Sequence, residues 1–377
     1  MRILILNHEY PPVGGGGGQA AQDIAKELSR RGHEITILTA HLKGLAREEV
    51  AGNIRILRLP SLRKHPYRAG FLAMGIYILA TINAGLQVIH RWHPDIIHVH
   101  FAVPAGAAAL ILSRLTGIPY VLTAHLGDIP GGVPEKTGRW FRWVFPFTKP
   151  IWQKAARIVT VSEYTRSLIR KHYPVNPVVI PNGINMQMVN PDELLVHHPP
   201  VVTFAGRFMP QKNLVELVET LALVQDLSWK CIMVGDGPLL EDVRRTIATH
   251  DLDKRFFLPG WVTTEQVLAY FAQSDLLFMP SLSEGLPVVG LQALASGLAI
   301  VASRAGGNVE IVEPGYNGFL VDPGDREGFS NSLRSLLSNP QALQIARQAS
   351  RKLASRFDIK TVVDKYESIF QEIVLAQ

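Results

Sequence analysis

Short apolar runs alternate with amphipathic stretches along the first half of the chain. The runs are rich in Ile, Leu and Val and bounded by turn residues, as is typical of buried strands. Between them apolar residues recur at helical spacing, so that Ala21, Ile24 and Leu28 fall on one face of a helix over 19–30. The pattern predicts strands over 2–7, 34–39, 95–99, 119–123 and 157–161.

The same alternation restarts in the second half of the chain. It predicts strands over 201–205, 230–234, 256–258, 276–279, 299–301 and 318–321. Strands separated by helices imply parallel sheets that are covered on both faces. Because the series runs twice, the sequence predicts two doubly wound, Rossmann-like α/β domains.

Turn residues indicate where the first domain gives way to the second. Pro181 and Gly183 interrupt the periodic pattern, and a polar, Pro-rich stretch follows at 190–200. We therefore expect an N-terminal domain over 1–182 and a C-terminal domain over 183–359. The last helix, 360–375, has apolar residues at helical spacing, and we expect residues 360–377 to pack back across the join onto the first domain.

The composition narrows the class of protein. The chain has 377 residues, of which 47% are hydrophobic and 19% charged, so it can bury sizeable cores and is not disordered. Its single cysteine, Cys231, lies in an apolar run and excludes a disulfide framework. The opening apolar run is too short for a signal peptide, so a cytoplasmic location is the default expectation.

The charge is distributed unevenly along the chain. Residues 1–182 have 22 Lys and Arg against 10 Asp and Glu, net +12, whereas the remaining residues are net −6. A basic half indicates an anionic neighbour, such as a membrane surface or a charged acceptor, or else charge scattered over a solvated surface. No nucleic-acid recognition module accompanies the basic residues, so we expect no nucleic-acid partner.

Two segments of the basic half suit the surface of a membrane. Cations and aromatic residues interleave over 139–147 and continue to Lys154, and Arg63, Lys64 and Arg68 precede the apolar stretch 71–89. That stretch approaches the length of a bilayer span, but its polar residues favour a buried core helix. The aromatic and basic residues support peripheral contact with an anionic membrane, on its inner face.

Five consecutive glycines, 14–18, follow the first predicted strand. They do not match the dinucleotide fingerprint G-x-G-x-x-G because Gln19 occupies the last glycine position, so a nicotinamide or flavin site is not supported. Glycines that lead into a helix leave their N–H groups open to an anionic or hydroxylated ligand. A flexible turn would give the same pattern.

Two cations follow the strand predicted over 201–205. Ligands of open α/β sheets lie at the carboxyl ends of strands. Arg207 and Lys212 stand at such an end and suit a diphosphate, because Arg binds it as a fork and Lys as a compact point charge. Two ordinary surface charges would look the same in the sequence.

The segment 283–297 follows the strand predicted over 276–279. Pro287 suits the first turn of a helix, and Gly297 suits the residue just beyond its end. The start of this helix would point into the cleft between the two domains with a partial positive charge. Glu284, just ahead of it, could accept hydrogen bonds from two sugar hydroxyls, or it could serve only as a favourable charge at the helix start.

Taken in order and spacing, these pieces resemble the retaining glycosyltransferases of the GT-B fold, specifically glycosyltransferase family 4. The resemblance runs along nearly the whole chain. It rests on the glycine loop, TAHLGD at 123–128, VSE at 161–163, PNG at 181–183, Gly206-Arg207 with Lys212, VGDGP at 234–238, PG at 259–260, the helix after Glu284, and Gly306-Gly307 through 312.

The resemblance implies a role for each matching residue. It places Gly16 and Gly17 near the donor diphosphate and the acceptor, and His125 beside the reacting sugar. Arg207 and Lys212 would neutralise the leaving diphosphate, and Glu284 would hold hydroxyls of the donor sugar. Backbone groups of Gly285 and Leu286 would face the phosphates, and residues around Gly235 and Trp261 would flank the base. The other implied substrate-binding positions are Asp128, Asn182, Gly206 and Gln292.

The chain departs from the family pattern at two positions. The family has a second glutamate eight residues after the first, which binds the ribose hydroxyls, and this chain has Gln292 there. A hydrogen bond to a charged partner contributes about 1.5–3 kcal/mol against about 0.5–1.5 for a neutral one, so we expect donor binding to be weaker by roughly 1 kcal/mol. Pro287 replaces a glycine of many relatives and removes one N–H from the phosphate side.

The resemblance therefore implies transfer of a sugar from a UDP-, GDP- or ADP-sugar to an acceptor hydroxyl, on a glycan, a lipid-linked sugar or a small molecule, by a hexosyltransferase. It suggests front-face attack with retention, since the two-carboxylate scheme of glycosidases finds no second carboxylate. Neither a cofactor nor a metal is expected, although His98 and His100 share a strand face. A sugar-nucleotide epimerase of the same fold and a non-catalytic sugar-nucleotide binder are the alternatives.

Overall fold

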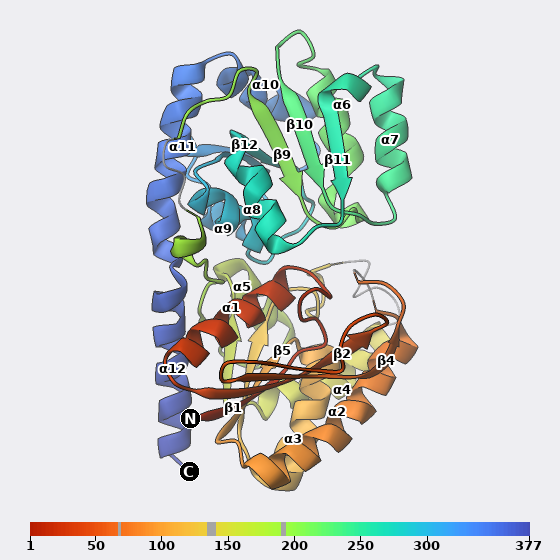
Figure 1. Ribbon diagram of the computed structural model, residues 1–377, viewed down its shortest axis with the longest axis vertical. Coiled ribbons are helices and arrows are strands. Elements are labelled where there is room, and N and C mark those ends of the chain that lie inside the picture. Colours follow the sequence, from red (N-terminus) through yellow and green to blue (C-terminus); the bar gives the residue numbers. More distant parts are fainter. Residues whose placement is uncertain (67–68, 134–140, 190–193) are drawn as a thin grey trace. The chain divides into compact units, whose positions relative to one another are not determined.

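The computed structural model describes residues 1–66, 69–133, 141–189 and 194–377, and of residues 141–143 only the backbone. The chain divides into two units, Met1–Gly183 with Ile359–Gln377, and Ile184–Asp358 (Figure 1). This division falls one residue beyond the predicted join, and the last helix is part of the first unit. Arg68 and the first residues of the aromatic and basic segment 139–147 lie outside the described residues.

The first unit is built on an eight-stranded sheet with the order β3-β4-β2-β1-β5-β6-β7-β8. The strands are β1 (Arg2–Leu6), β2 (Glu34–Leu42), β3 (Glu48–Ala51), β4 (Ile54–Arg63), β5 (Ile96–His100), β6 (Tyr120–Ala124), β7 (Arg157–Thr160) and β8 (Val178–Val179). Only β3 and β4 pair antiparallel; the other neighbours are parallel. From β4 to β7 the strands follow the doubly wound order 3-2-1-4-5-6, whose switch point lies between β1 and β5.

Helices cover both faces of this sheet. They are α1 (Gly16–Arg30), α2 (Phe71–Trp92), α3 (Ala107–Thr116), α4 (Phe141–Gln153), α5 (Glu163–His172) and α12 (Ile359–Leu375). Successive strand residues point to opposite faces. Ile3 and Ile5 of β1 therefore pack with α1 and α12 on one face, and Leu4 and Leu6 pack with α2, α3 and α4 on the other (Figure 1).

Helix α2 is the described helix that is long and apolar enough to cross a bilayer. It packs against β4 and α3 and buries Tyr77, Thr81 and Val88, and the Tyr77 hydroxyl donates to the Leu38 carbonyl oxygen at 2.9 Å. Six of its 22 residues are buried, whereas Leu72 and Leu79 are 71% and 70% exposed, so α2 is a surface helix with one buried face and not the buried core helix predicted over 71–89.

The second unit is built on a six-stranded parallel sheet with the order β11-β10-β9-β12-β13-β14. The strands are β9 (Val201–Ala205), β10 (Lys230–Val234), β11 (Phe256–Gly260), β12 (Leu276–Met279), β13 (Ala299–Ser303) and β14 (Gly318–Val321). The helices are α6 (Leu214–Ala222), α7 (Leu240–Thr249), α8 (Thr264–Ala272), α9 (Val288–Ala295), α10 (Arg326–Leu337) and α11 (Pro340–Ala354). This is again the order 3-2-1-4-5-6, with its switch point between β9 and β12.

The structure differs from the predicted elements in three places. Strands β3, β4 and β8 were not predicted. Helix α1 begins at Gly16 and not at residue 19, so three of the five glycines form its first turn. Pro287 does not lie in the first helical turn but is the residue before it, with extended backbone (φ −70°, ψ 114°), and α9 begins at Val288.

Candidate functional site

The predicted donor residues of the second unit lie at its switch point. Arg207 and Lys212 follow β9, and Ser283 and Glu284 follow β12, the two strands between which the sheet reverses its order. Helices leave such a pair of strands in opposite directions, which makes the point where the strand order reverses the usual ligand site of this fold. The topology thus brings together two segments that lie 72 residues apart in the sequence.

Direct contacts join these two segments. The Lys212 Nζ donates to Glu284 Oε1 at 2.5 Å, and both side chains are largely buried. Beside this ion pair, Gln211 Nε2 donates to the Ser283 carbonyl oxygen at 2.5 Å, and the Leu282 N–H donates to the Gln211 carbonyl oxygen at 2.8 Å. Glu284 is therefore fixed by the same segment that carries the two predicted phosphate-binding cations.

Two consecutive glycines, Gly306 and Gly307, lie against the backbone of Glu284 and Gly285. A Cβ at Gly306 would lie 1.8 Å from the Glu284 carbonyl oxygen, and one at Gly307 would lie 1.9 Å from the carbonyl oxygen of Gly285. The Gly307 N–H donates to the Glu284 carbonyl oxygen at 3.0 Å, and Gly306 has φ +56°. The sequence shows this Gly-Gly pair only as part of a motif, and in the structure the two glycines form the backbone cradle of Glu284.

Glycines also stand at the carboxyl ends of β9, β10 and β11, on one side of the switch point. A Cβ at Gly235 would lie 1.9 Å from the Gly206 carbonyl oxygen, and the Gly235 N–H donates to the Gly260 carbonyl oxygen at 2.9 Å. Trp261, which follows, is 37% exposed. The ends of β9, β10 and β11 thus present backbone without side chains, followed after β11 by the partly exposed indole of Trp261.

Helix α9 carries the residue that departs from the family pattern. Gln292 is buried, and its side-chain amide makes no hydrogen bond to another described residue. Leu286 is buried just before the helix. At the other end, Gly297 has φ +68°, and the N–H groups of Gly297 and Leu298 donate to the carbonyl oxygens of Leu294 and Ala293, which is the helix end predicted for Gly297.

The glycine segment of the first unit lies at that unit's own switch point, after β1. The Gly15 N–H donates to Glu9 Oε2 at 3.2 Å, and α1 begins at Gly16. A Cβ at Gly17 would lie 2.4 Å from Phe101 Cζ and 3.3 Å from His125 Cγ. The predicted residues Gly17 and His125 therefore meet, and Phe101, which was not predicted, lies against both.

His125, which is partly exposed, belongs to a cluster of three histidines with the buried His98 and His100. Its Nε2 lies 3.0 Å from Nδ1 of His100, with the two ring planes 16° apart and their centroids 5.3 Å apart, and the His98 and His100 ring centroids are 4.3 Å apart. Burial lowers the pKa of His98 to about 3 and that of His125 to about 4, and it holds the pKa of His100 well below its usual range. All three imidazoles are therefore neutral at pH 7.

The other predicted residues of this unit are buried. Asp128 accepts a hydrogen bond from the Ala102 N–H, which holds the turn after β5, and Asn182 is buried close to the end of the unit. His98 Nε2 lies 2.9 Å from Thr123 Oγ1. Among the described residues, no group of three or more His, Cys, Asp or Glu side chains is arranged to hold a metal ion.

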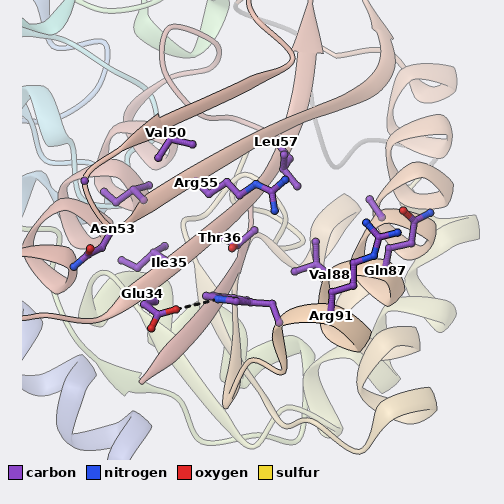
Figure 2. A pocket seen from close by; sticks show the side chains of 14 residues that line it. Glu34, Ile35, Thr36, Val50, Asn53, Arg55, Leu57, Gln87, Val88 and Arg91 are labelled. Atoms are coloured by element: carbon purple, nitrogen blue, oxygen red, sulfur yellow. Dashed lines mark hydrogen bonds between the residues drawn. The ribbon is translucent and has the colours of Figure 1, made fainter.

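A cavity of about 440 Å³ lies elsewhere in the first unit (Figure 2). Its lining includes Glu34 and Arg55, at the starts of β2 and β4, and Gln87 and Arg91 of α2, and the Trp92 Nε1 donates to Glu34 at 3.1 Å. The glycine segment follows the carboxyl end of β1, so this cavity lies at the opposite ends of the strands. It contains none of the predicted site residues.

Comparisons with known proteins agree with this geometry. The family description Glycosyltransferase Family 4 matches residues 14–188, and Glycosyl transferases group 1 matches residues 189–353. A Bacillus subtilis (strain 168) glycosyltransferase named for teichuronic acid biosynthesis is 30% identical over 332 residues, which cover 81% of this chain and 82% of that protein.

Two solved structures share the whole fold. Sucrose-phosphate synthase from Thermosynechococcus elongatus superposes with a TM-score of 0.88 at 19% identity, over 100% of both chains. The Anabaena protein HepE in complex with UDP-glucose superposes with a TM-score of 0.76 at 21% identity, also over 100% of both chains.

Proposed function

The chain belongs to the GT-B glycosyltransferases of family 4, and on that premise we propose that it moves a hexose from a nucleoside diphosphate hexose to an acceptor hydroxyl, with retention of configuration. The observation that carries this proposal is the Lys212–Glu284 pair across the switch point of the second unit. It sets a cation for phosphate beside a carboxylate for sugar hydroxyls.

In this proposal the second unit stabilises the leaving group. Departure of a nucleoside diphosphate develops negative charge, and preorganised donors aimed at such charge supply most of the catalysis in comparable sites. Arg207 and Lys212 bring two positive charges, and the start of α9 adds a partial one. We propose that these groups neutralise the negative charge of the departing diphosphate and that the reaction needs no metal.

The route by which configuration is retained is proposed from how the carboxylates near the glycine segment are used. A covalent glycosyl intermediate needs a carboxylate free to attack the sugar. In the first unit, Glu9 accepts the Gly15 N–H and Asp128 accepts the Ala102 N–H, so each is engaged in holding backbone. We therefore propose front-face attack, in which the departing phosphate takes the proton of the acceptor hydroxyl.

The donor is proposed to be a UDP-hexose, because HepE, a neighbour in fold, holds UDP-glucose. The test is to incubate the protein with UDP-, GDP- and ADP-hexoses and a panel of sugar and glycolipid acceptors, and to measure the nucleoside diphosphate released. The anomeric coupling of the product in a proton NMR spectrum reports retention. Interconversion of the donor hexose with no release would indicate an epimerase, and binding with no turnover a non-catalytic binder.

We further propose that the helical layer α2–α3–α4 rests on an anionic membrane, on the cytoplasmic side. These three helices contain no Asp or Glu, whereas α1 and α12 on the opposite face contain five. Arg91, Arg114 and Lys149 are exposed on the layer, and none of them forms an ion pair with another described residue. A surface without carboxylates avoids repulsion from anionic lipid, and each basic residue near it contributes about 1 kcal/mol to binding.

The same layer exposes large apolar side chains. Leu72 and Leu79 of α2 are 71% and 70% exposed, Leu115 of α3 is 64% exposed, and Phe147 of α4 is 77% exposed. Adjacent helices of the layer are in contact, so these side chains belong to one surface. Apolar side chains among cations are typical of helices that lie in a lipid interface.

Flotation with vesicles tests this contact. The wild type is expected to float with vesicles of anionic phospholipid at low salt and to be released by salt. The double variant Leu72→Glu, Leu79→Glu should remain in solution. Ile345→Glu, a matched control at a half-exposed position of the second unit, should float like the wild type. Wild-type protein that stays in solution at low salt, or floats equally with zwitterionic vesicles, contradicts the charge argument.

A further inference from the structure

The pair His100 and His125 has a feature that the proposed transfer does not use. His100 lies at the end of β5 and is completely buried, and its Nδ1 lies 3.0 Å from Nε2 of the partly exposed His125. Two neutral imidazoles at this distance share one proton, so one nitrogen donates and the other accepts. The tautomer of each ring is thereby tied to the tautomer of the other.

The surroundings of His100 decide which ring donates. The remaining nitrogen of His100, Nε2, is buried and has no hydrogen-bond partner among the described residues. If His125 donated, His100 would carry its proton on Nε2 as an unpaired buried N–H. If His100 donates, Nε2 keeps only a lone pair, and an unpaired buried acceptor is tolerated more often than an unpaired buried donor.

The geometry points to His100 as a positioning residue that donates from Nδ1 to Nε2 of His125 and so holds His125 with its own proton on Nδ1. His125 is then a neutral hydrogen-bond donor toward a sugar or phosphate oxygen and not a general base. This inference rests on the proposed function for the identity of the ligand oxygen. The tautomer itself follows from the structure of the first unit alone.

The ring of His98 lies against His100 and begins a second chain of contacts. The His98 ring packs on the His100 ring, and His98 Nε2 lies 2.9 Å from Thr123 Oγ1, which lies 3.1 Å from the Tyr366 hydroxyl of α12. Among the described residues, the titratable groups that act on His100 are the imidazoles of His98 and His125, and the Glu9 carboxylate acts on His125. Burial in these surroundings lowers the pKa of all three histidines, which keeps the shared proton between neutral rings.

The direct test is a long-range proton–nitrogen correlation spectrum of the full chain labelled with ¹⁵N-histidine at pH 7. Loss of signals in His125→Gln assigns the ring. We expect the His125 ring to carry its proton on Nδ1. A proton on Nε2 of His125 overturns the inference, whether or not the protein proves to be a transferase, so the spectrum separates this inference from the proposed function.

Kinetics of three variants test the consequence. His100→Leu removes the donor, and we expect kcat to fall about tenfold or more while the donor KM changes less than twofold, because the tautomer of the His125 ring is no longer fixed. His100→Asn places an amide N–H near the former Nδ1 and should recover most of kcat. His98→Phe, the control, keeps a ring against His100 and should lower Tm without changing kcat or the His125 tautomer.

Equal losses in the Leu and Asn variants, or a loss confined to KM, contradict a positioning role. If His100→Leu fails to fold, the spectrum of the wild type and the kcat of His100→Asn still decide the matter.

Discussion

Replacing Gly307 by alanine tests the backbone cradle of Glu284. The new Cβ would lie 1.9 Å from the Gly285 carbonyl oxygen and 2.7 Å from its carbon, whereas real Cβ contacts essentially never fall under 3.0 Å. Relief needs a shift of about 1 Å, and a misplacement of that size costs about 100-fold when it moves a reacting group. We therefore expect kcat/KM for the nucleotide sugar to fall about 100-fold, with a loss of about 1–3 kcal/mol of stability from overpacking.

The assay is release of nucleoside diphosphate over a range of donor concentrations, with Tm measured on the same samples. Gly75→Ala is the matched control, because a Cβ there meets nothing within 4 Å and alanine favours the helix α2 by about 1 kcal/mol. It should leave kcat/KM unchanged. Activity of Gly307→Ala within twofold of the wild type would refute the cradle, since the segment carrying Glu284 would then tolerate the displacement.

Three further predictions concern the second unit's ligand groups and the buried histidines. Glu284→Gln keeps an acceptor for Lys212 but removes the charge, and it should lower kcat/KM about tenfold or more, measured by nucleotide release. Gln292→Glu should tighten nucleotide binding by roughly 1 kcal/mol, several-fold in Kd by calorimetry, and lower the Tm of the free protein because the new carboxylate is buried. Burial lowers the pKa of His98 to about 3 and that of His125 to about 4, so below the ordinary histidine pKa the unfolded chain binds more protons than the folded chain. The stability of the folded protein should therefore fall as pH is lowered from about 6.5 toward 4. A Tm that stays constant over this range would contradict the assignment of neutral imidazoles.

The sequence predicts most strands of the second unit well because each is a mainly apolar run. The predicted bounds of β9, β10, β12 and β14 agree with the structure residue for residue. Strand β3 could not be predicted, since all four of its residues are exposed and it pairs only at the edge of the sheet. Strand β4 alternates apolar residues with arginines and contains Pro60, which weakened its signal.

The first residue of α1 could not be predicted because glycine has a low helix propensity. Three glycines open the helix because Gly17 and Gly18 have no room for a Cβ against Phe101 and the Glu9 carbonyl oxygen. Such crowding depends on segments distant in sequence. The cradle formed by Gly306 and Gly307 was hidden for the same reason, although the two residues were noted as a motif.

More of the donor site than of the histidine cluster could be predicted from the sequence. Arg207, Lys212 and Glu284 each follow a strongly apolar strand, and the doubly wound order then brings the ends of β9 and β12 together. The contact of His100 with His125 depends on the pairing of β5 with β6, in which His100 lies opposite Thr123. Had the two strands been taken as neighbours, His125, two residues beyond Thr123, would have been expected near His100.

The central claim is that the second unit binds a nucleoside diphosphate at its switch point through Lys212, beside Glu284. Calorimetric titration of the full chain with UDP, GDP and ADP tests it most directly. We predict that UDP binds selectively, as the proposed UDP-hexose donor requires, and that Lys212→Met weakens this binding about tenfold or more because a charge-assisted contact worth about 1.5–3 kcal/mol is lost. Failure of all three nucleotides to bind, or equal affinity of the wild type and Lys212→Met, would contradict the claim.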